Sequence, residues 1–486
     1  MSGGGRWLGL DIGTSGVKAV LVDDADRMVA EASAPLTVDR PRPGWSEQDP
    51  DAWWRAAQSV LDRLAAGHRP DMARVGAIGL SGQMLGVAPV DADGRPLRPA
   101  LLWNDARAVR AGAALEAAVQ GFASITGARA MPGFSAPKIR WLRENEPSAL
   151  DRARWVLLPK DVVRLHLTGE AVSDRADASA TLLMATREGD WHAPILAAAG
   201  IDRARLPTLV DSGTVAAALR PALSARWGLP QNVPVAGGAG DNMCGGIGAG
   251  VDRHGAAYVS LGTSAVVFIA NRAFVPSLGQ GMHTHRHGVA GLYCQQAVAL
   301  SAAAALSWIA GILGAEVGAL VAEVDAAAPD VGATPVFTPY LAGERTPHDD
   351  ASLTGAFSGL SLATGRAHLV QAVMEGVALA IADCRDALAS TGADPSSLAL
   401  VGGGARSRRW ADLIASALER PLTVPPSAAV GPALGAARLA RLAAGGPLVA
   451  RAAEAGHVAV PDRAMADALH AKRARYRAHL TLARGE

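Results

Sequence analysis

The sequence predicts an α/β protein with two related domains, and two observations lead to this prediction. Apolar runs of strand length alternate with longer amphipathic runs along most of the 486 residues. A strand–turn–strand pattern with Gly13-Thr14-Ser15 in its turn returns about half a chain later with Gly262-Thr263-Ser264. Such a repeat predicts that each domain begins with the same unit. We therefore expect one domain over residues 1–250 and a second over residues 251–486.

The first half alternates between predicted helices and strands. Residues 50–67 have helical periodicity, Asp49 can cap their first turn, and Pro50 suits the first helical position. Residues 75–82 form an apolar run that predicts a buried strand. A turn at residues 91–94, between two apolar runs, predicts a hairpin.

The second half continues this alternation. Residues 398–419 predict a strand, a glycine turn and a helix, and Pro432 lies in the first turn of a further helix. Residues 288–315 carry no charge, but their polar side chains and many Ala and Gly residues make them too weakly apolar for a membrane span. We expect a strand followed by a buried helix there, and Ala-rich covering helices near the C-terminal end.

Composition argues against several classes of partner. The chain has 46 basic and 45 acidic residues, a formal net charge of +1, so we expect no nucleic-acid partner. Cys244, Cys294 and Cys384 are odd in number and far apart, which predicts buried thiols in a reducing cytosol. The first residues lack the layout of a signal peptide, so we expect a cytoplasmic protein that does not associate with a membrane.

Four glycine-rich turns follow predicted strands. Backbone N–H groups of glycine can surround an anion, and Thr or Ser hydroxyls add donors. One such turn is usually a plain chain reversal, whereas four in an alternating chain favour a nucleotide-phosphate site between two domains. Neither a Walker motif nor a dinucleotide-binding motif is present. The turns are Gly13-Thr14-Ser15, Gly237–Asp241, Gly262-Thr263-Ser264 and Gly402–Ser407.

Charged residues accompany these turns. Asp11 would repel phosphate unless a cation intervenes, which indicates Mg²⁺ held through water; alternatively, Asp11 bonds the N–H groups of its turn. Lys18 either offsets phosphate charge or is solvated. Asp241 lies at the carboxyl end of a strand, where α/β proteins bind ligands. It can accept the proton of an attacking hydroxyl, or it can cap the next helix.

Three alternating histidines, His283, His285 and His287, would share one face of a strand. Metal binding is one interpretation of this pattern. No carboxylate is placed to complete a coordination shell, so we do not expect a metal there.

Taken together, these motifs resemble the FGGY family of carbohydrate kinases over nearly the whole chain. "DIGTSGVK" resembles the family's first phosphate loop, "SLGTS" the second and "GGGARS" its adenosine motif. "GFSAPKIRWLREN" and "GAFSGLSLATGRAHLVQAVME" resemble the two family signatures. Further matching segments follow in the same order: "WSEQDP", "LLWNDAR", "MPGF", "LLPKD", "YLAGERTPH" and "GPALGAARLA".

The resemblance implies two actin-like, ribonuclease-H-like ATPase domains flanking a catalytic cleft that closes over sugar and ATP. It implies phosphorylation of D-xylulose to D-xylulose 5-phosphate, with ATP and Mg²⁺ as cofactors, Asp241 as the catalytic base and Asp11 as the residue that organises the metal. The implied nucleotide contacts are Gly13, Thr14, Ser15, Lys18, Thr263, Gly403, Gly404 and Ala405. The implied sugar contacts are Met84, Leu85, Trp103, Asn104, Asp105, Asp241 and Asn242.

Position 85 departs from the family pattern. Relatives usually read Gln-Met-His-Gly, with a sugar-binding His, where this chain reads Gln83-Met84-Leu85-Gly86. The side chain of leucine offers no hydrogen bond to a sugar. The residues expected to transfer the phosphoryl group lie elsewhere, so the departure affects only which sugar is bound. Another pentulose or a pentitol is the alternative substrate. A nucleotide-binding regulator without transfer is a more distant alternative. A small-molecule sugar is the expected partner, and the sequence leaves a monomer and a homodimer both open.

Overall fold

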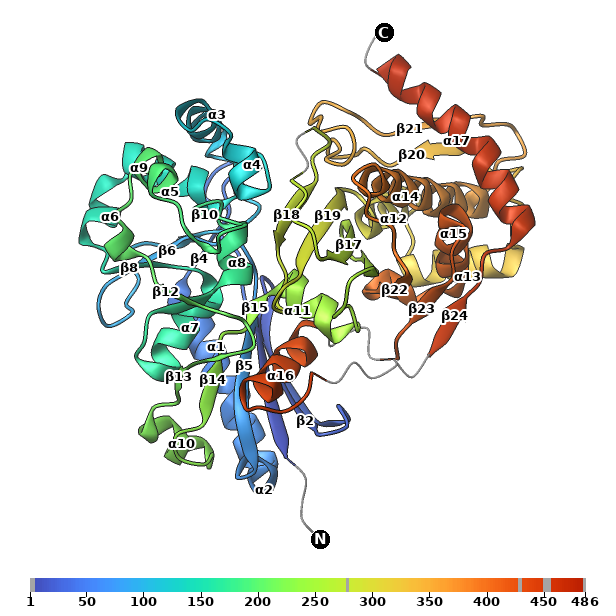
Figure 1. The fold of residues 1–486 in the computed structure, drawn as a ribbon. Coiled ribbons are helices and arrows are strands. Elements are labelled where there is room, and N and C mark those ends of the chain that lie inside the picture. Colours follow the sequence, from blue (N-terminus) through green and yellow to red (C-terminus); the bar gives the residue numbers. More distant parts are fainter. Residues whose placement is uncertain (1–4, 277–278, 427–430, 449–455, 484–486) are drawn as a thin grey trace.

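The computed structural model describes residues 5–276, 279–426, 431–448 and 456–483 of the chain. These residues form two lobes that lie side by side in Figure 1, and each lobe is built around a seven-stranded sheet. The first lobe carries the blue-to-green part of the chain, and the second carries mostly its yellow-to-red part. The predicted α/β class is confirmed.

The first sheet has the strand order β13-β14-β5-β1-β2-β3, and β15 pairs with β5. β1 is antiparallel to β2 and parallel to β5, so a hairpin around the first glycine turn leads into a crossover. Its strands are β1 (Arg6–Ile12), β2 (Gly16–Asp23), β3 (Met28–Pro35), β5 (Val75–Gly82), β13 (Val215–Ala218), β14 (Pro234–Ala236) and β15 (Ala239–Gly240).

The second sheet has the order β18-β19-β17-β16-β22-β23-β24. β16 is antiparallel to β17 and parallel to β22, which repeats the relation of β1 to β2 and β5. The predicted repeat of a strand–turn–strand unit is therefore confirmed. The strands are β16 (Ala256–Leu261), β17 (Ala265–Asn271), β18 (His283–Arg286), β19 (Tyr293–Ala299), β22 (Ser397–Val401), β23 (Leu422–Val424) and β24 (His457–Ala459).

Helix α1 (Pro50–Gly67) covers one face of the first sheet. The Asp49 side chain accepts a hydrogen bond from the backbone N–H of Asp51, so the predicted cap is confirmed. Trp53, Val60 and other residues on one side of the helix are buried. Full burial of such a side chain stabilises the fold by roughly 1.5–3 kcal/mol. Packing, more than helix propensity, therefore holds α1 in place.

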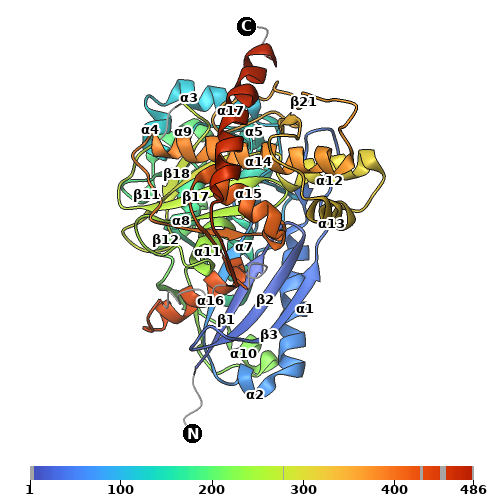
Figure 2. The same ribbon diagram turned by 90° about the vertical axis from the view of Figure 1, so that its right-hand side faces the viewer.

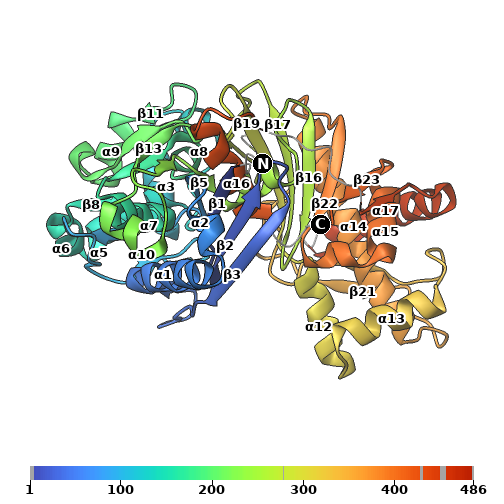
Figure 3. The ribbon, with the colours of Figure 1, turned by 90° about the horizontal axis from the view of Figure 1, so that it is seen from below.

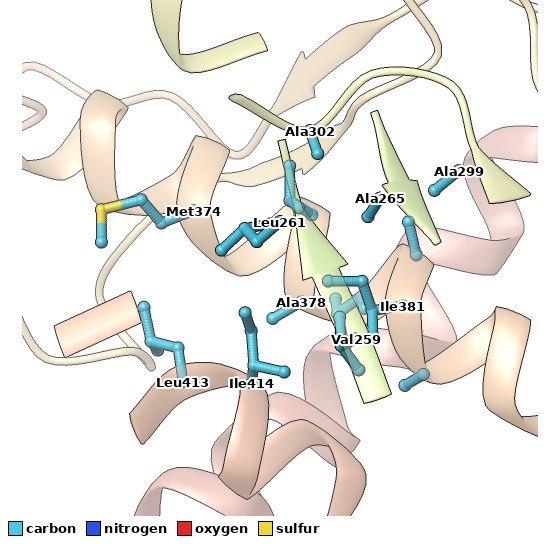
Figure 4. Packing of buried hydrophobic residues seen from close by; sticks show 14 of the residues in the cluster. Val259, Leu261, Ala265, Ala299, Ala302, Met374, Ala378, Ile381, Leu413 and Ile414 are labelled. Carbon is cyan, nitrogen blue, oxygen red and sulfur yellow. The ribbon is translucent and has the colours of Figure 1, made fainter. Parts of the chain in front are cut away.

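The core of the second lobe lies between its sheet and the helices α14 (Arg366–Ala389) and α15 (Arg408–Leu418). Figure 4 shows Val259 and Leu261 of β16 among side chains of these two helices. Because successive side chains of a strand point to opposite faces, Ser260 points away from this core. That opposite face of the sheet borders the cleft between the lobes.

Two short helices cross between the lobes. Helix α11 (Asp241–Gly248), which follows the first sheet in sequence, packs on Tyr258 and Phe268 of the second sheet. Helix α16 (Gly431–Ala443), from the end of the chain, packs on the first sheet, beside β1 and β5 in Figures 1 and 3.

Glycine makes the packing of α16 possible. A Cβ atom at Gly9 of β1 would lie 1.9 Å from the carbonyl oxygen of Ala433, so only glycine admits the helix at this distance. Arg438 and Arg441 of α16 form buried ion pairs with Asp26, at 2.9 and 2.7 Å, in the turn after β2. Helix α16, from the later part of the chain, thus belongs to the first lobe. The predicted domain boundary after residue 250 stays a prediction.

Smaller elements surround these layers, and α17 runs along the outside of the second lobe in Figure 2. The remaining helices are α2 (Arg69–Met72), α3 (Val109–Ala118), α4 (Phe122–Thr126), α5 (Ser135–Asn145), α6 (Pro147–Arg152), α7 (Pro159–Thr168), α8 (Arg175–Ala180), α9 (Ala193–Ala199), α10 (Pro221–Trp227), α12 (Ala303–Leu313), α13 (Val317–Ala327) and α17 (Arg463–Ala483). Two 3₁₀ turns are η1 (Arg203–Arg205) and η2 (Gly403–Arg406). The two-stranded sheets pair β4 (Glu47–Gln48) with β7 (Ala100–Leu101), β6 (Ala88–Val90) with β8 (Trp155–Leu157), β9 (Val172–Asp174) with β12 (Thr208–Val210), β10 (Met184–Ala185) with β11 (Asp190–Trp191), and β20 (Val336–Thr338) with β21 (Ala356–Ser358).

The predicted hairpin around residues 91–94 is formed only in part. The turn is present, with the N–H of Asp91 donating to the carbonyl of Arg95. The two arms bond to each other irregularly: Val87 and Leu101 exchange two backbone hydrogen bonds, and the N–H of Leu97 donates to the carbonyl of Pro89. The regular ladders are those of β6 with β8 and of β7 with β4.

Uncharged and strongly apolar segments are mostly internal. Residues 288–315 contain β19 and then α12, and one side of α12 is buried, in agreement with the prediction. Among the described residues, α14 is the single helix that is by itself long and apolar enough to span a membrane, and 83% of its apolar window is buried inside the protein.

Candidate active site

Two cavities of about 260 Å³ each meet at Asp241. Asn242 and Ser260 also line both of them. The first cavity extends toward Met84, Leu85 and Trp103 and toward the turn at Gly262-Thr263-Ser264. We call it the sugar-side cavity. The second extends toward Gly402 and Gly431, and we call it the nucleotide-side cavity. A group on Asp241 can therefore reach ligands in both spaces.

Asp241 is the first residue of α11, directly after β15. Burial, together with the charge of Asp11, raises the pKa of Asp241 to about 7. The N–H of Asn242 donates to Asp241 Oδ1 at 2.8 Å, which orients the carboxylate. Gly240 occupies the N-cap position of this helix, so capping is not the role of Asp241.

Asp11 lies near the end of β1, beside Ser81 of β5 and Lys18 of β2 in the sheet register. Burial raises its pKa to about 6. Within the part of the chain that the structure describes, Asp11 Oδ1 is buried without a hydrogen-bond partner. An unsatisfied carboxylate oxygen fits a hydrated Mg²⁺, which accepts oxygen ligands and keeps several waters. Lys18 forms an ion pair with Glu31, at 3.0 Å, on the neighbouring strand.

The turn at Gly13-Thr14-Ser15 contacts the sugar-side cavity through Trp103, whereas the turn at Gly262-Thr263-Ser264 lines that cavity directly. In the first, the Thr14 hydroxyl donates to Gln83 and accepts from the Trp103 indole N–H, at 3.0 and 3.1 Å. Ser15 is exposed. In the second, Gly262, Thr263 and Ser264 line the sugar-side cavity.

The last glycine turn contributes a different residue from those expected. Gly402, with φ +98°, lines the nucleotide-side cavity together with Gly431 and Pro432. Gly403, Gly404 and Ala405 form the 3₁₀ turn η2 that follows. They do not border that cavity within the described residues, so their contact with adenosine stays a prediction.

Leu85 occupies an unusual backbone conformation in the wall of the sugar-side cavity. Its φ is +68°, in the left-handed region that side chains rarely adopt. The carbonyl oxygen of Leu85 accepts from Lys138 Nζ at 2.8 Å and from Ser135 Oγ at 2.9 Å. Lys138 Nζ also donates to the carbonyl of Leu102 at 2.8 Å, next to Trp103. Lys138 thus holds two segments of this wall together.

Two of the expected sugar contacts lie elsewhere. The Asp105 carboxylate is buried, accepts from the N–H of Ser46 at 2.7 Å and pairs with Arg107 at 2.7 Å. Neither Asp105 nor Asn104 lines the sugar-side cavity within the described part of the chain. Their contact with sugar stays a prediction that this geometry does not favour.

The sequence matches the FGGY family of carbohydrate kinases in both of its domains. The N-terminal domain of that family matches residues 6–248, and the C-terminal domain matches residues 257–444. The chain belongs to the FGGY family of carbohydrate kinases. This confirms the resemblance and the two-domain, actin-like ATPase fold that it implies.

Relatives of this FGGY kinase are similar along nearly their whole length. The xylulose kinase of Escherichia coli K12 is 41% identical over 440 residues, which cover 90% of each chain. The crystal structure of a xyloylose kinase from Brucella ovis has 43% identity and a TM-score of 0.93, covering 97% of this chain and 98% of that one. The xylulose kinase from Rhodospirillum rubrum has 32% identity and a TM-score of 0.89, covering 98% of each chain. These relatives support sugar phosphorylation by ATP as the activity.

Several residues of this FGGY kinase site escaped the sequence interpretation. Ser260 and Gly431 lie in the quoted motifs "SLGTS" and "GPALGAARLA" but were not assigned to the site, and the tertiary structure places them in one cavity with Asp241. Lys138 could have been suspected, because it lies in the first family signature. The other residues of the sugar-side cavity that the sequence interpretation did not assign to the site are Phe134, Val266, His283, His285, Gln296, Val298 and Arg345.

Proposed function

We propose that the protein transfers the γ-phosphoryl group of ATP to D-xylulose, with D-xylulose 5-phosphate and ADP as products. The position of Asp241 carries this proposal, because its carboxylate is shared by a cavity suited to a sugar and a cavity bounded by glycine turns. The names of relatives that cover nine-tenths or more of this chain support D-xylulose as the sugar.

In the proposed mechanism, Asp241 accepts the proton of the attacking sugar hydroxyl. A pKa near 7 suits this task, because the group is ionised in part at neutral pH and still basic enough to take a proton. The Asn242 N–H fixes one carboxylate oxygen, which leaves the other free to face the hydroxyl. Little covalent chemistry remains for the protein beyond this proton and the alignment of the two substrates.

Phosphates are held, in this proposal, by the turns at Gly13-Thr14-Ser15 and at Thr263. Asp11 would hold Mg²⁺ through water, and the bound ion would offset the negative charge of the phosphates. Lys18 contributes positive charge near the first of these turns, and its ion pair with Glu31 offsets part of that charge. Adenosine would lie beyond Gly402, near Gly403, Gly404 and Ala405.

A second candidate is the same transfer to another pentulose or to a pentitol, and Leu85 is the observation that favours it. A regulator that binds nucleotide without transfer is a weaker candidate, because Asp241, Asn242 and the turns are all in place. We also propose two domains, residues 1–250 and 251–486, a cytoplasmic location, and no nucleic-acid or membrane partner. A monomer and a homodimer both fit the proposal.

The test is an assay that couples ADP release to a recorded signal, with and without D-xylulose. We expect ADP release that depends on D-xylulose and on Mg²⁺. A panel of pentuloses and pentitols in the same assay separates the first candidate from the second. ATP binding without ADP release for any sugar would favour the regulator.

A further inference from the structure

Two histidines of β18 form part of the wall of the sugar-side cavity. His283 and His285 lie opposite Gln296 and Cys294 of β19 in the antiparallel register, so the two rings share one face of the sheet. Their ring centroids are 6.0 Å apart, and the ring planes are 20° from parallel. Leu85 lines the same cavity from the first lobe.

Three of the four nitrogens of these two rings are buried without a partner among the described residues. His283 is 5% exposed and His285 is 2% exposed. Both nitrogens of His283 and Nδ1 of His285 are buried without a hydrogen bond to any described residue. Phe134 packs against the two rings, at 5.2 and 6.1 Å between centroids, and offers no acceptor. Buried polar groups normally have partners, so this pair points to a ligand that supplies them.

A sugar hydroxyl matches what the two rings offer. Burial lowers the pKa of His285 to about 4, and burial together with the charge of Arg345 lowers that of His283 well below its usual value. Both rings are therefore neutral at pH 7, with one donor and one acceptor nitrogen each. A hydroxyl also donates and accepts. Among the described residues, no three metal-ligating side chains come together here.

We propose that His285, with His283 beside it, binds a hydroxyl group of the sugar from the second lobe and takes the place of the imidazole that position 85 lacks. The inference rests on the proposed sugar kinase activity. It assigns part of the selectivity for the sugar to β18, which carries no phosphate loop. Gln296 connects this wall to the catalytic residues, because its side-chain oxygen accepts from Asn242 Nδ2 at 3.3 Å.

The test compares two substitutions of His285. His285→Phe keeps a ring of similar size and removes the hydrogen bonds, whereas His285→Gln keeps a donor and an acceptor. We expect His285→Phe to raise the KM for D-xylulose about tenfold with kcat little changed, and His285→Gln to retain most of the affinity. His287→Phe is the control, and it also removes the hydrogen bond that His287 Nδ1 accepts from the N–H of Val289 at 3.0 Å. His287 is equally buried, but it packs on Phe268 outside the cavity, so the sugar KM should not change.

Monodeoxy sugars identify the hydroxyl, through a comparison of the wild type with His285→Phe. One deoxy-D-xylulose should lose most of its kcat/KM with the wild type and little with His285→Phe. In addition, Leu85→His should lower KM more in the His285→Phe background than in the wild type, because either imidazole can serve the sugar.

Three outcomes separate the inference from the proposed function. Sugar phosphorylation with an unchanged KM and an unchanged deoxy-sugar profile in His285→Phe would overturn the inference alone. No phosphorylation of any sugar, together with calorimetric binding of D-xylulose that His285→Phe weakens, would overturn the proposed function and support the inference. An equal rise in KM for His287→Phe would point to structural damage and contradict the inference.

Discussion

The buried side-chain nitrogen of Lys138 donates a hydrogen bond to the carbonyl oxygen of Leu85 at 2.8 Å. Lys138 lies on α5, whereas Leu85 lies in the turn that follows β5. The bond joins a helix of the first family signature to the segment that departs from the family pattern. The wall of the sugar-side cavity therefore keeps its backbone geometry although the side chain at position 85 is unusual.

We expect Lys138→Met to destabilise the protein by about 1–3 kcal/mol, because it leaves the carbonyl of Leu102 without its buried side-chain donor and the carbonyl of Leu85 with the Ser135 hydroxyl alone. The sugar KM should rise as this wall loosens. Urea unfolding and steady-state kinetics measure the two effects. Lys18→Met is the matched control for stability, because its ion pair is partly exposed and worth about 1 kcal/mol or less. Equal stability losses in both variants would contradict the role of Lys138.

Asp241→Ala should lower kcat by about 10²–10⁴-fold and leave ATP binding largely intact, because a general base typically contributes that factor. Calorimetric titration with an ATP analogue and the ADP-release assay provide the measurements. Asp211→Ala removes an exposed carboxylate of the same lobe, paired with Arg175, and should leave the rate unchanged. Near-normal turnover in Asp241→Ala would remove this residue from the mechanism.

The contribution of Asp241 to the stability of the metal-free protein should fall as pH rises from about 4 to 7. The pKa of Asp241 is about 7 in the folded protein and 3.8 for the ordinary group. Between these two values the unfolded chain loses the proton while the folded protein keeps it, so rising pH favours the unfolded chain. Asp241→Asn removes this effect, which amounts to at most about 4 kcal/mol. The variant should be more stable than the wild type at pH 8, and the two should converge toward pH 4.

Thermal unfolding across this pH range, with a chelator present, tests that expectation. Asp62→Asn provides a control of opposite sign, because a hydrogen bond from Arg226 lowers the pKa of Asp62. This second variant should lose stability at neutral pH. A difference between Asp241→Asn and the wild type that does not vary with pH would contradict the raised pKa.

Leu85→His should lower the KM for D-xylulose by tenfold or less, with little change in kcat, as expected for added uniform binding. Stability should not fall, because His tolerates the left-handed backbone at this position better than Leu does. Leu85→Phe supplies a ring without hydrogen bonds and should not lower KM. An unaltered KM and sugar ranking in Leu85→His would refute the expectation, and a wild type that prefers another sugar by orders of magnitude would make Leu85 a specificity determinant.

The repeat and its turns could be predicted from the sequence because they depend on local features. Strand periodicity, glycine in tight turns and a carboxylate at a strand end are properties of neighbouring residues. These properties are sufficient to predict that Asp11, Thr14, Asp241 and Thr263 lie near the cleft. The free cysteines were also expected, and all three are buried thiols.

Only the tertiary structure decided which distant residues share a cavity. The shared face of His283 and His285 followed from the sequence, but their place in the same cavity as Leu85 depends on how β18 pairs with β19 and how the lobes meet. Asp105 is an example of a residue whose expected contact the structure does not favour. The resemblance assigns its carboxylate to the sugar, but that carboxylate accepts from the N–H of Ser46 and pairs with Arg107. Periodicity acts over a few residues, whereas a binding site is made by long-range packing that no short stretch of sequence encodes.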